Sequence, residues 1–434
     1  MPSENNQASP ANIQKFKISS NTSGEALDLS GGVVEFRYYE SVLSNNVTAT
    51  AVIVDSGYQS EGDQIKAAKG VLDSLPVRGG ERTDITVEDN EGNKLTFKRG
   101  LYVNRVRDAD PGTSKDVFFI DFASQEFFAN EQQRVMQRFE GKISEHVNQI
   151  LSTIDGKIEQ IDNTSLNYNF IGNDRKPFYT CTWLASKAVP DKDVGSAAGY
   201  LFYQTRDGFN FRSIDKLFEQ EPVKKFIFNN TGDRTPGNDS NILDYSIDSD
   251  IDLKQNMTLG TYNNRSIYFN PFAMDYYVKE YKYQPDRLGK AGKYFAANEV
   301  AEEFTNSPTR LMSHVFDVGA MPNGTGNDQL EQWKQSPTSP NYDAENTMAQ
   351  SVMRYNQMFT VKINVTITAD LSIKAGDTVK CTFPEVSGTQ QTDQNPQTGG
   401  IYMVASVCHR ITPRDSFTRL ALVRDSFGTK SGFK

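Results

Sequence analysis

The most constraining feature of this sequence is a short segment that occurs twice, far apart in the chain. The first copy, LPVRGGE, spans 75–81, and the second copy, LSIKAGD, spans 371–377. In each copy a glycine precedes an acidic residue and an apolar run, which is typical of a tight turn that enters a β hairpin. The sequence therefore predicts two units of one β fold. The matched positions are Leu75 with Leu371, Val77 with Ile373, Arg78 with Lys374, Gly80 with Gly376, and Glu81 with Asp377.

The residues after the two segments also match in order. A short strand-like run follows each segment, at 84–88 and at 379–383. The next strand opens with LYV at 101–103 in the first copy and with IYM at 401–403 in the second. A single shared turn is common among unrelated β barrels, but three matched elements in one order favour a duplication. One chain would then supply two similar units to a ring or a stack.

Alternating patterns indicate β strands around both segments. Val34, Phe36 and Tyr38 fall on one face of an expected strand. Glu35 and Arg37 fall on the other face. The chain also contains 27 Phe and 19 Tyr, residue types that fit a pleated, half-buried surface. The pattern predicts that much of the chain is β sheet.

The period of the apolar residues changes in the middle of the chain. Val147, Ile150, Leu151 and Ile154 have the spacing of one helical face. Further helical and hairpin patterns follow, so we expect 125–228 to form a mixed α/β unit.

The expected fold class is mixed α+β and dominated by β structure. It contains two tube-type antiparallel β barrels, an inserted α/β domain, and a loop-rich insertion in the second barrel. The expected bounds are 12–124 for the first barrel, 125–228 for the α/β domain, 229–285 for the start of the second barrel, 286–344 for the insertion, and 345–428 for the rest of the second barrel.

Charge and composition exclude several classes of protein. The chain has 46 Lys and Arg against 55 Asp and Glu, a net charge of -9, which disfavours broad phosphate binding. The three cysteines form no CxxC pair, and the three histidines are scattered, so we expect neither a disulfide framework nor a zinc cluster. Cys408 and His409 are neighbours on an expected strand and point to opposite faces, which excludes them as a nucleophilic pair. We also expect no secretory leader and no membrane insertion.

One acidic run resembles the beginning of a calcium loop. Asp248, Asp250 and Asp252 alternate along it. The EF-hand pattern requires Gly and Glu at two later positions, where this chain has Leu253 and Leu259. We therefore expect three acids on one exposed strand face, with no metal and no cofactor.

A set of short segments in a fixed order extends beyond the repeat. In this order they resemble the central baseplate hub protein of contractile-tailed bacteriophages, and the resemblance covers most of the chain apart from 284–341. The segments are VEFRYYES at 34–41, TATAVIVD at 48–55, LPVRGGE at 75–81, FEGKISE at 139–145, AGYLFY at 198–203, FRSID at 211–215, GIY at 400–402 and LVRDS at 422–426.

The resemblance implies a structural protein of the virion tail baseplate that is assembled in the bacterial cytoplasm. Such a hub is a homotrimer whose six barrels adapt the sixfold tail tube to the threefold spike. The implied partners are the tail tube protein, a separate spike protein, baseplate wedge proteins and a tape-measure protein. DNA would pass through the ring without specific binding, and no enzymatic activity is implied.

Two alternatives remain open on the residues alone. A tail-associated cell-wall hydrolase would need convergent carboxylates or a metal site. A carbohydrate-binding adhesin would need exposed aromatic platforms.

Overall fold

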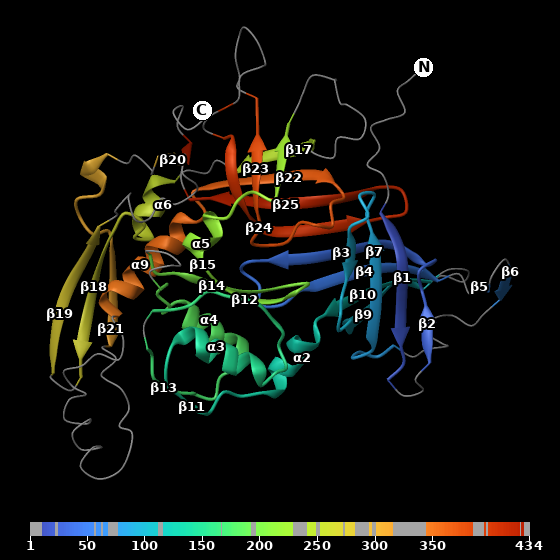
Figure 1. Cartoon of the computed structure of the whole chain (residues 1–434), viewed down its shortest axis with the longest axis horizontal. Coiled ribbons are helices and arrows are strands. Elements are labelled where there is room, and N and C mark those ends of the chain that lie inside the picture. The colour runs from blue at the N-terminus through green and yellow to red at the C-terminus, as the bar shows by residue number, and fades with distance from the viewer. Residues whose placement is uncertain are drawn as a thin grey trace, which may run out of the picture.

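The structure is a computed structural model of the chain. It places a large, strongly curved sheet beside a helical unit and a small outer sheet (Figure 1). In the part of the chain that the structure describes, no helix is long and apolar enough to cross a membrane. The described residues are 11–21, 25–55, 58–61, 64–67, 77–111, 116–165, 167–191, 197–228, 241–248, 252–271, 274–282, 295–296, 301–315, 344–384, 395, 398–425 and 427–428.

A 14-stranded sheet contains both β units, and its longest path is β17-β22-β25-β24-β3-β4-β10-β9-β7-β1-β2. All pairings along this path are antiparallel. The fold is thus β-dominated with a large antiparallel sheet, as the sequence indicated. We call β1 to β10 the first half and β16, β17 and β22 to β25 the second half.

The first half curls around one apolar core. Alternation places Phe36 and Tyr38 of one strand and Ala49 and Ala51 of the next inside this core, where none is more than 1% exposed. Its strands are β1 (Asn12–Ser19), β2 (Ala26–Asp28), β3 (Val33–Ser41), β4 (Thr48–Asp55), β7 (Arg82–Glu88), β8 (Lys94–Thr96), β9 (Leu101–Pro111) and β10 (Asp116–Ala123), with a separate hairpin of β5 (Tyr58–Glu61) and β6 (Gln64–Ala67).

The second half encloses its own core and closes on itself. Its path returns from β24 through β23 to β16, and a bridge between Ile227 and Asn241 then brings β16 beside the start of β17. Val361, Ile363 and Val365 line the core, as strict alternation predicts. Its strands are β16 (Lys224–Ile227), β17 (Ile242–Asp248), β22 (Val361–Thr368), β23 (Thr378–Thr382), β24 (Gly400–Ile411) and β25 (Ser416–Arg424).

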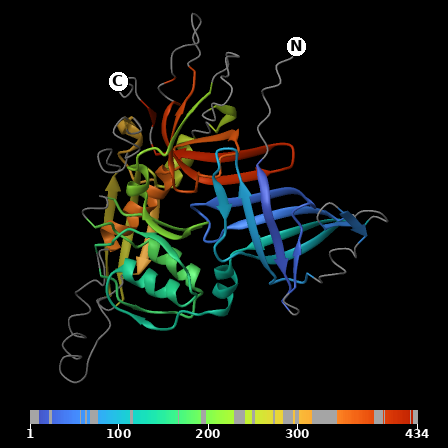
Figure 2. The same ribbon diagram turned by 45° about the vertical axis from the view of Figure 1, so that its right-hand side comes forward.

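A mixed α/β unit lies between the two halves in sequence and packs below the second half and beside the first (Figures 1 and 2). Its core joins Val147 and Ile150 of one helix to Phe202 and Phe209 of a hairpin. Its elements are α2 (Gln125–Gln132), β11 (Arg138–Phe139), α3 (Ile143–Ser152), β12 (Ile158–Ile161), β13 (Phe170–Ile171), α4 (Pro177–Ala185), β14 (Tyr200–Thr205), β15 (Gly208–Ser213) and α5 (Ile214–Phe218).

The expectation that 229–285 begins the second barrel is only partly correct. Within this range β17 joins the large sheet, but β18 and β19 form a separate sheet with β21. The reason is that Tyr268 of β18 packs into the core of the α/β unit instead. This small sheet lies at the left of Figure 1, against α9. The elements are α6 (Leu253–Thr258), β18 (Asn263–Asn270), β19 (Asp275–Lys282), β21 (Arg310–Val315) and α9 (Ala344–Gln357).

The expected loop-rich insertion, 286–344, lies mostly outside the described residues. Its described parts include β20 (Phe295–Ala296), which pairs with β26 (Phe427–Gly428), and a 3-10 turn at Glu302–Phe304. The strand β21 also falls in this range, so the insertion contains regular structure that the composition did not indicate.

Candidate assembly interface

The two repeated turns have the same backbone geometry. Gly80 and Gly376 have φ values of +83° and +91°, which lie in the region that favours glycine. The Gly80 N–H donates to the Val103 carbonyl at 2.7 Å, and the Gly376 N–H donates to the Val404 carbonyl at 2.9 Å. In return, the Val103 N–H donates to the Glu81 backbone carbonyl at 2.9 Å, and the Val404 N–H donates to the Asp377 backbone carbonyl at 2.8 Å. The two glycines therefore occupy equivalent positions.

The acidic residue of each turn accepts hydrogen bonds from the turn's backbone. Glu81 accepts from the N–H groups of Arg78 and Gly79, both at 2.8 Å. Asp377 accepts from the Lys374 N–H at 2.8 Å. Asp377 is one methylene shorter than Glu81, and the next N–H in its turn, that of Ala375, instead donates to Glu40 of the first half at 3.0 Å.

The side chains of the repeated segments lie in different surroundings. Val77 packs in the core of the first half and Ile373 in the core of the second. Leu371, however, packs in the core of the first half, and its N–H donates to Asp89 at 2.9 Å. Its expected counterpart, Leu75, lies outside the described residues.

β9 of the first half is equivalent to β24 of the second half. The residues that correspond in the structure differ by one position from those matched in the sequence. β7 pairs Thr83 with Leu101, whereas β23 pairs Val379 with Tyr402. Leu101 is therefore equivalent to Tyr402, and both face a core. The match of LYV with IYM was wrong by one position, because shared letters outweighed the inward and outward alternation that governs strand register.

Both halves contain β-bulges at the same two places. One bulge falls between Val33 and Glu35 of β3 and recurs between Ile242 and Asp244 of β17. This bulge turns Val34 outward, where it is 45% exposed, so the expectation that it shares a face with Phe36 and Tyr38 was wrong.

The second bulge lies in β9 and recurs in β24. The pairing of β9 with β10 shifts between Val103 and Arg105, and the pairing of β24 with β25 shifts between Val404 and Ser406. The strands are therefore equivalent one by one: β3 with β17, β4 with β22, β10 with β25, and β9 with β24. Bulges at matched positions are conserved features of a fold, which supports the interpretation of a duplication.

The two halves join through the pairing of β24 with β3. Six residue pairs connect these strands, from Ser406 opposite Ser41 to Ile411 opposite Phe36. As a result eight long strands, from β17 to β9, form one continuous antiparallel surface. We refer to the contact between β24 and β3 as the join.

A buried histidine lies at the join. His409 is opposite Tyr38, with their rings parallel and the ring centroids 6.2 Å apart. Its Nδ1 lies 2.9 Å from the Thr418 hydroxyl oxygen. Burial lowers the pKa of His409 to about 3, so the imidazole is neutral at ordinary pH. The geometry is that of a packed residue within a sheet.

The two strands at the ends of the eight-stranded surface have open edges. β9 pairs with β7 only through Leu101 and Tyr102, and in the part of the chain that the structure describes no strand lies beside its remaining residues on that side. On β24 the same edge first pairs with β23 and then with β3. At the other end, only the bridge at Asn241 lies beside β17 on its outer side among the described residues. Open edges of this kind are templates for pairing with another chain.

Some of the charges on the face opposite the cores are paired. Glu35 contacts Arg37 and also Arg410, the latter at 2.7 Å across the join. Burial raises the pKa of Glu35, but hydrogen bonds from Arg410 and Arg37 outweigh it and hold that pKa below its usual value. On β9, Arg107 contacts Asp121 at 3.0 Å. The surface thus carries charges of both signs in contact.

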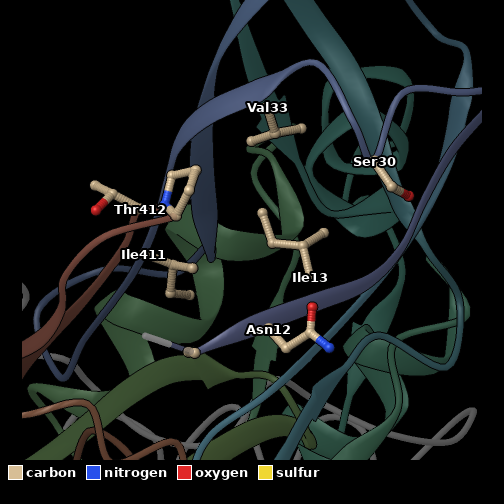
Figure 3. A pocket seen from close by; sticks show the side chains of 8 residues that line it. Asn12, Ile13, Ser30, Val33, Ile411 and Thr412 are labelled. Atoms are coloured by element: carbon tan, nitrogen blue, oxygen red, sulfur yellow. The ribbon is translucent and has the colours of Figure 1, made fainter. Parts of the chain in front are cut away.

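A cavity of about 310 Å³ marks the place where the first half remains open. It lies between the starts of β1 and β3, and the turn between β24 and β25 reaches into it (Figure 3). The Ala11 N–H donates to the Ser416 hydroxyl at 3.0 Å beside it. The second half therefore contributes Ile411, Thr412 and Pro413 to the lining of this cavity.

The acidic run that resembled a calcium loop does not lie on one strand. Asp248 ends β17, whereas Asp252 is the N-cap of α6 and accepts from the Gln255 N–H at 2.9 Å. Asp250 lies outside the described residues. The expectation of a single exposed face was wrong for Asp252, because Asp is also a preferred helix cap.

Two polar sites were missed at the sequence level. Glu40 is 2% exposed, and burial raises the pKa of its carboxyl above the usual value against opposing hydrogen bonds. Its signal was available, because Glu40 follows Phe36 and Tyr38 on the inward face. Arg354 of α9 contacts Asp215 at 2.8 Å and Asp425 at 2.6 Å, with all three side chains fully buried. No local pattern connects these three residues, which are distant in the chain.

Comparison with solved structures identifies similar folds. The 43 kDa tail protein of prophage MuSo2 from Shewanella oneidensis has a TM-score of 0.52 and 10% identity, and the match covers 95% of this chain and 98% of that one. A tail protein from Neisseria meningitidis MC58 has a TM-score of 0.50 and 11% identity, and covers 98% and 99%. No protein-family model and no curated protein matches the sequence. The fold implied by the resemblance is thus confirmed: the chain has the fold of these two phage tail proteins.

Proposed function

We propose that the protein is a structural subunit of a phage tail baseplate hub. Three copies form a ring of six similar β units between the tail tube and the spike. The fold supports this role, because it matches two phage tail proteins over nearly their whole length. The proposal assigns no catalytic role to the chain.

One observation carries the ring: the free edges are equivalent to the edges that already pair within the chain. β9 is equivalent to β24, and β17 is equivalent to β3, while β24 and β3 form the join. Repeating the join between chains would place β9 of one copy beside β17 of the next. Contacts of this head-to-tail kind form closed rings when the rotation closes. Three chains close a ring that is threefold overall and nearly sixfold in its repeated units.

The proposed ring surrounds a channel lined by the face opposite the cores. On this face Glu35, Arg37 and Arg410 form one cluster and Arg107 and Asp121 another. Paired charges attract phosphate less than a purely basic surface does, because an arginine must first give up its carboxylate partner. Such a lining suits the passage of DNA without binding.

The proposed ring is tested by the mass of the purified protein. We expect light scattering at micromolar concentration, alone or with the spike protein, to give three times the chain mass of 48.6 kDa. A dimer, or a chain that remains monomeric even with the spike protein, would overturn the ring. Lysis of purified cell wall in a zymogram would overturn the non-catalytic role.

A second candidate function, carbohydrate binding, is favoured by the outer face of the small sheet. Tyr276, Val278 and Phe269 are 66%, 48% and 39% exposed, and Leu311 and Val315 of β21 are 63% and 71% exposed. Tyr276 lies directly opposite Phe269 in the β18–β19 ladder. Exposed aromatic rings of this kind can stack on sugars. Binding in a glycan array that Tyr276→Ala abolishes would establish this function.

A further inference from the structure

The join can be used as a template for the contact between two copies. It places Cys408 opposite Tyr39. Cys408 pairs with Arg419 of β25, and at the equivalent place Arg107 of β9 pairs with Phe119 of β10. Counting both strands from the shared bulge gives the same result, so Arg107 is the counterpart of Cys408.

The counterpart of Tyr39 is found in the same way. Tyr39 is opposite Thr48 in the pairing of β3 with β4. Counted from the bulge that β3 and β17 share, the matching pair is Asp248 with Lys362. Asp248 of β17 is therefore the counterpart of Tyr39.

We propose that Arg107 of one copy lies directly opposite Asp248 of the next, in an antiparallel ladder between β9 and β17. This register rests on the proposed ring and specifies its contact. In the join the two positions hold neutral side chains, Cys408 and Tyr39. Between copies they would hold opposite charges, which are stabilising when they are directly opposite in a sheet.

The side chains at both edges are available for this contact. The Arg107 side chain is 43% exposed and that of Asp248 is 51% exposed. Arg107 contacts Asp121 at 3.0 Å on its own copy, and Asp248 lies 3.9 Å from Lys362. Across the contact the charges would alternate in sign over four neighbouring strands, from Asp121 to Lys362.

Burial on the inward face also indicates that this edge is incomplete in a single chain. Ile247 of β17 is 38% exposed, whereas Tyr38, its counterpart beneath the join, is fully buried. A neighbouring strand at this edge would cover Ile247 as β24 covers Tyr38. The edge thus lacks the cover that its equivalent has.

The charges also explain why the edges would pair head to tail and not with themselves. Two β17 edges side by side would bring together Asp244 and Asp248 from both copies, and two β9 edges would bring together Arg105 and Arg107. Like charges that face each other across a sheet are destabilising, and such repulsion is a common means of rejecting the wrong partner. The charge pattern therefore favours a ring over a twofold dimer.

The register is tested by crosslinking. The full chain carries Arg107→Cys with Asp248→Cys in a Cys408→Ser background, and the assembled protein is oxidised with copper–phenanthroline so that a disulfide can form between neighbouring copies. We expect covalent trimers on a denaturing gel. Matched controls move the second cysteine to Ser246 (same face, two residues away) or to Ile247 (opposite face). Both should react at least about tenfold more slowly, because bridging requires close and aligned Cβ atoms.

The charge pairing has a separate test. Arg107→Asp alone and Asp248→Arg alone should each lower the trimer fraction at a fixed micromolar concentration, and the double variant should restore it. Unchanged circular dichroism and unfolding midpoints would show that the variants fold. A full trimer in both single variants, with no coupling between them, would overturn the pairing.

The outcomes distinguish this register from the proposed function. A trimer by mass whose control cysteines react as fast as the 107–248 pair, or in which that pair does not react, overturns the register and leaves the ring. A monomer at every concentration, with or without the spike protein, overturns both.

Discussion

The two repeated turns share a backbone but differ in what covers them. A Cβ atom built on Gly80 would lie 3.7 Å from the nearest side-chain atom, Asn21 Nδ2. A Cβ atom on Gly376 would collide with the ring of Tyr203 from the α/β unit. Lys374 contacts Glu159 at 2.5 Å and Asp207 at 3.0 Å, both in that unit. The turn at Gly80 therefore has no contact of this kind among the described residues, whereas the turn at Gly376 also packs against the α/β unit.

The equivalent strands β24 and β9 also differ in what covers their outward side chains. Met403 is fully buried in a small core between the second half and the α/β unit. Its counterpart Tyr102 is half-buried. A residue that points away from the core of its own half can thus become core when another unit packs against it. The inner faces of the two units must each fill a core, whereas their outer faces have no such constraint in common.

The largest expected effect separates the two glycines. Gly376→Ala should lower the free energy of unfolding by about 3–5 kcal/mol, from the strained backbone together with overpacking against Tyr203. Gly80→Ala should cost only about 1–2 kcal/mol, from the backbone alone. Urea unfolding followed by fluorescence measures both. Equal losses would show that the cover over the second turn contributes nothing.

The next comparison uses two equivalent outward side chains, Met403 of β24 and Tyr102 of β9. Met403→Ala should cost about 3 kcal/mol, because it leaves a cavity in a closed core. Tyr102→Ala should cost about 1 kcal/mol, because its surroundings are partly open. The same unfolding measurement applies. A larger loss for Tyr102 would mean that the first half has a cover at this position as well.

A third prediction contrasts the join with the free edge through pH. The folded pKa of His409 is about 3, below the unfolded value of about 6.5. The unfolded chain therefore binds the proton first, and stability is lost as pH falls below about 6.5.

The expected loss from His409 between pH 7.5 and pH 5 is about 2 kcal/mol. His409→Gln should remove this share of the pH dependence, whereas Cys408→Ser, on the opposite face of the same strand, should leave it unchanged. At the free edge, β9 has Asp108 at the position equivalent to His409, so no histidine contributes to the pH dependence there. An identical pH dependence in wild type and His409→Gln would contradict the buried neutral imidazole.

The smallest expected effect compares the basic residues of the two turns. Lys374→Met should lower the free energy of unfolding by about 1 kcal/mol, because it removes two partly exposed ion pairs. Arg78→Met, on the exposed turn, should change it by less than about 0.5 kcal/mol. Thermal unfolding in low and high salt measures both, since salt should reduce only the first difference. A salt-independent loss would indicate that the Lys374 stem acts by packing.

Local patterns were sufficient for the repeated elements and insufficient for their partners. Gly80 and Gly376 could be matched from the sequence because both have a positive φ, a conformation that favours glycine. The match of 101–103 with 401–403 was wrong by one residue, since a bulge and an alternating face leave no single-letter signal. Leu371 was matched to its repeat, yet it packs in the core of the other half.

The sequence by itself determined the β-dominated fold, the two similar turns and the mixed unit between them, because strand alternation, helical spacing and turn glycines are local properties. Only the tertiary structure decided that β24 pairs with β3, that β18 and β19 leave the second barrel, and that Arg354 meets Asp215 and Asp425. These contacts join residues far apart in the chain. They depend on which apolar surfaces can close together, and that choice is made by the packing of whole units and not by any local pattern.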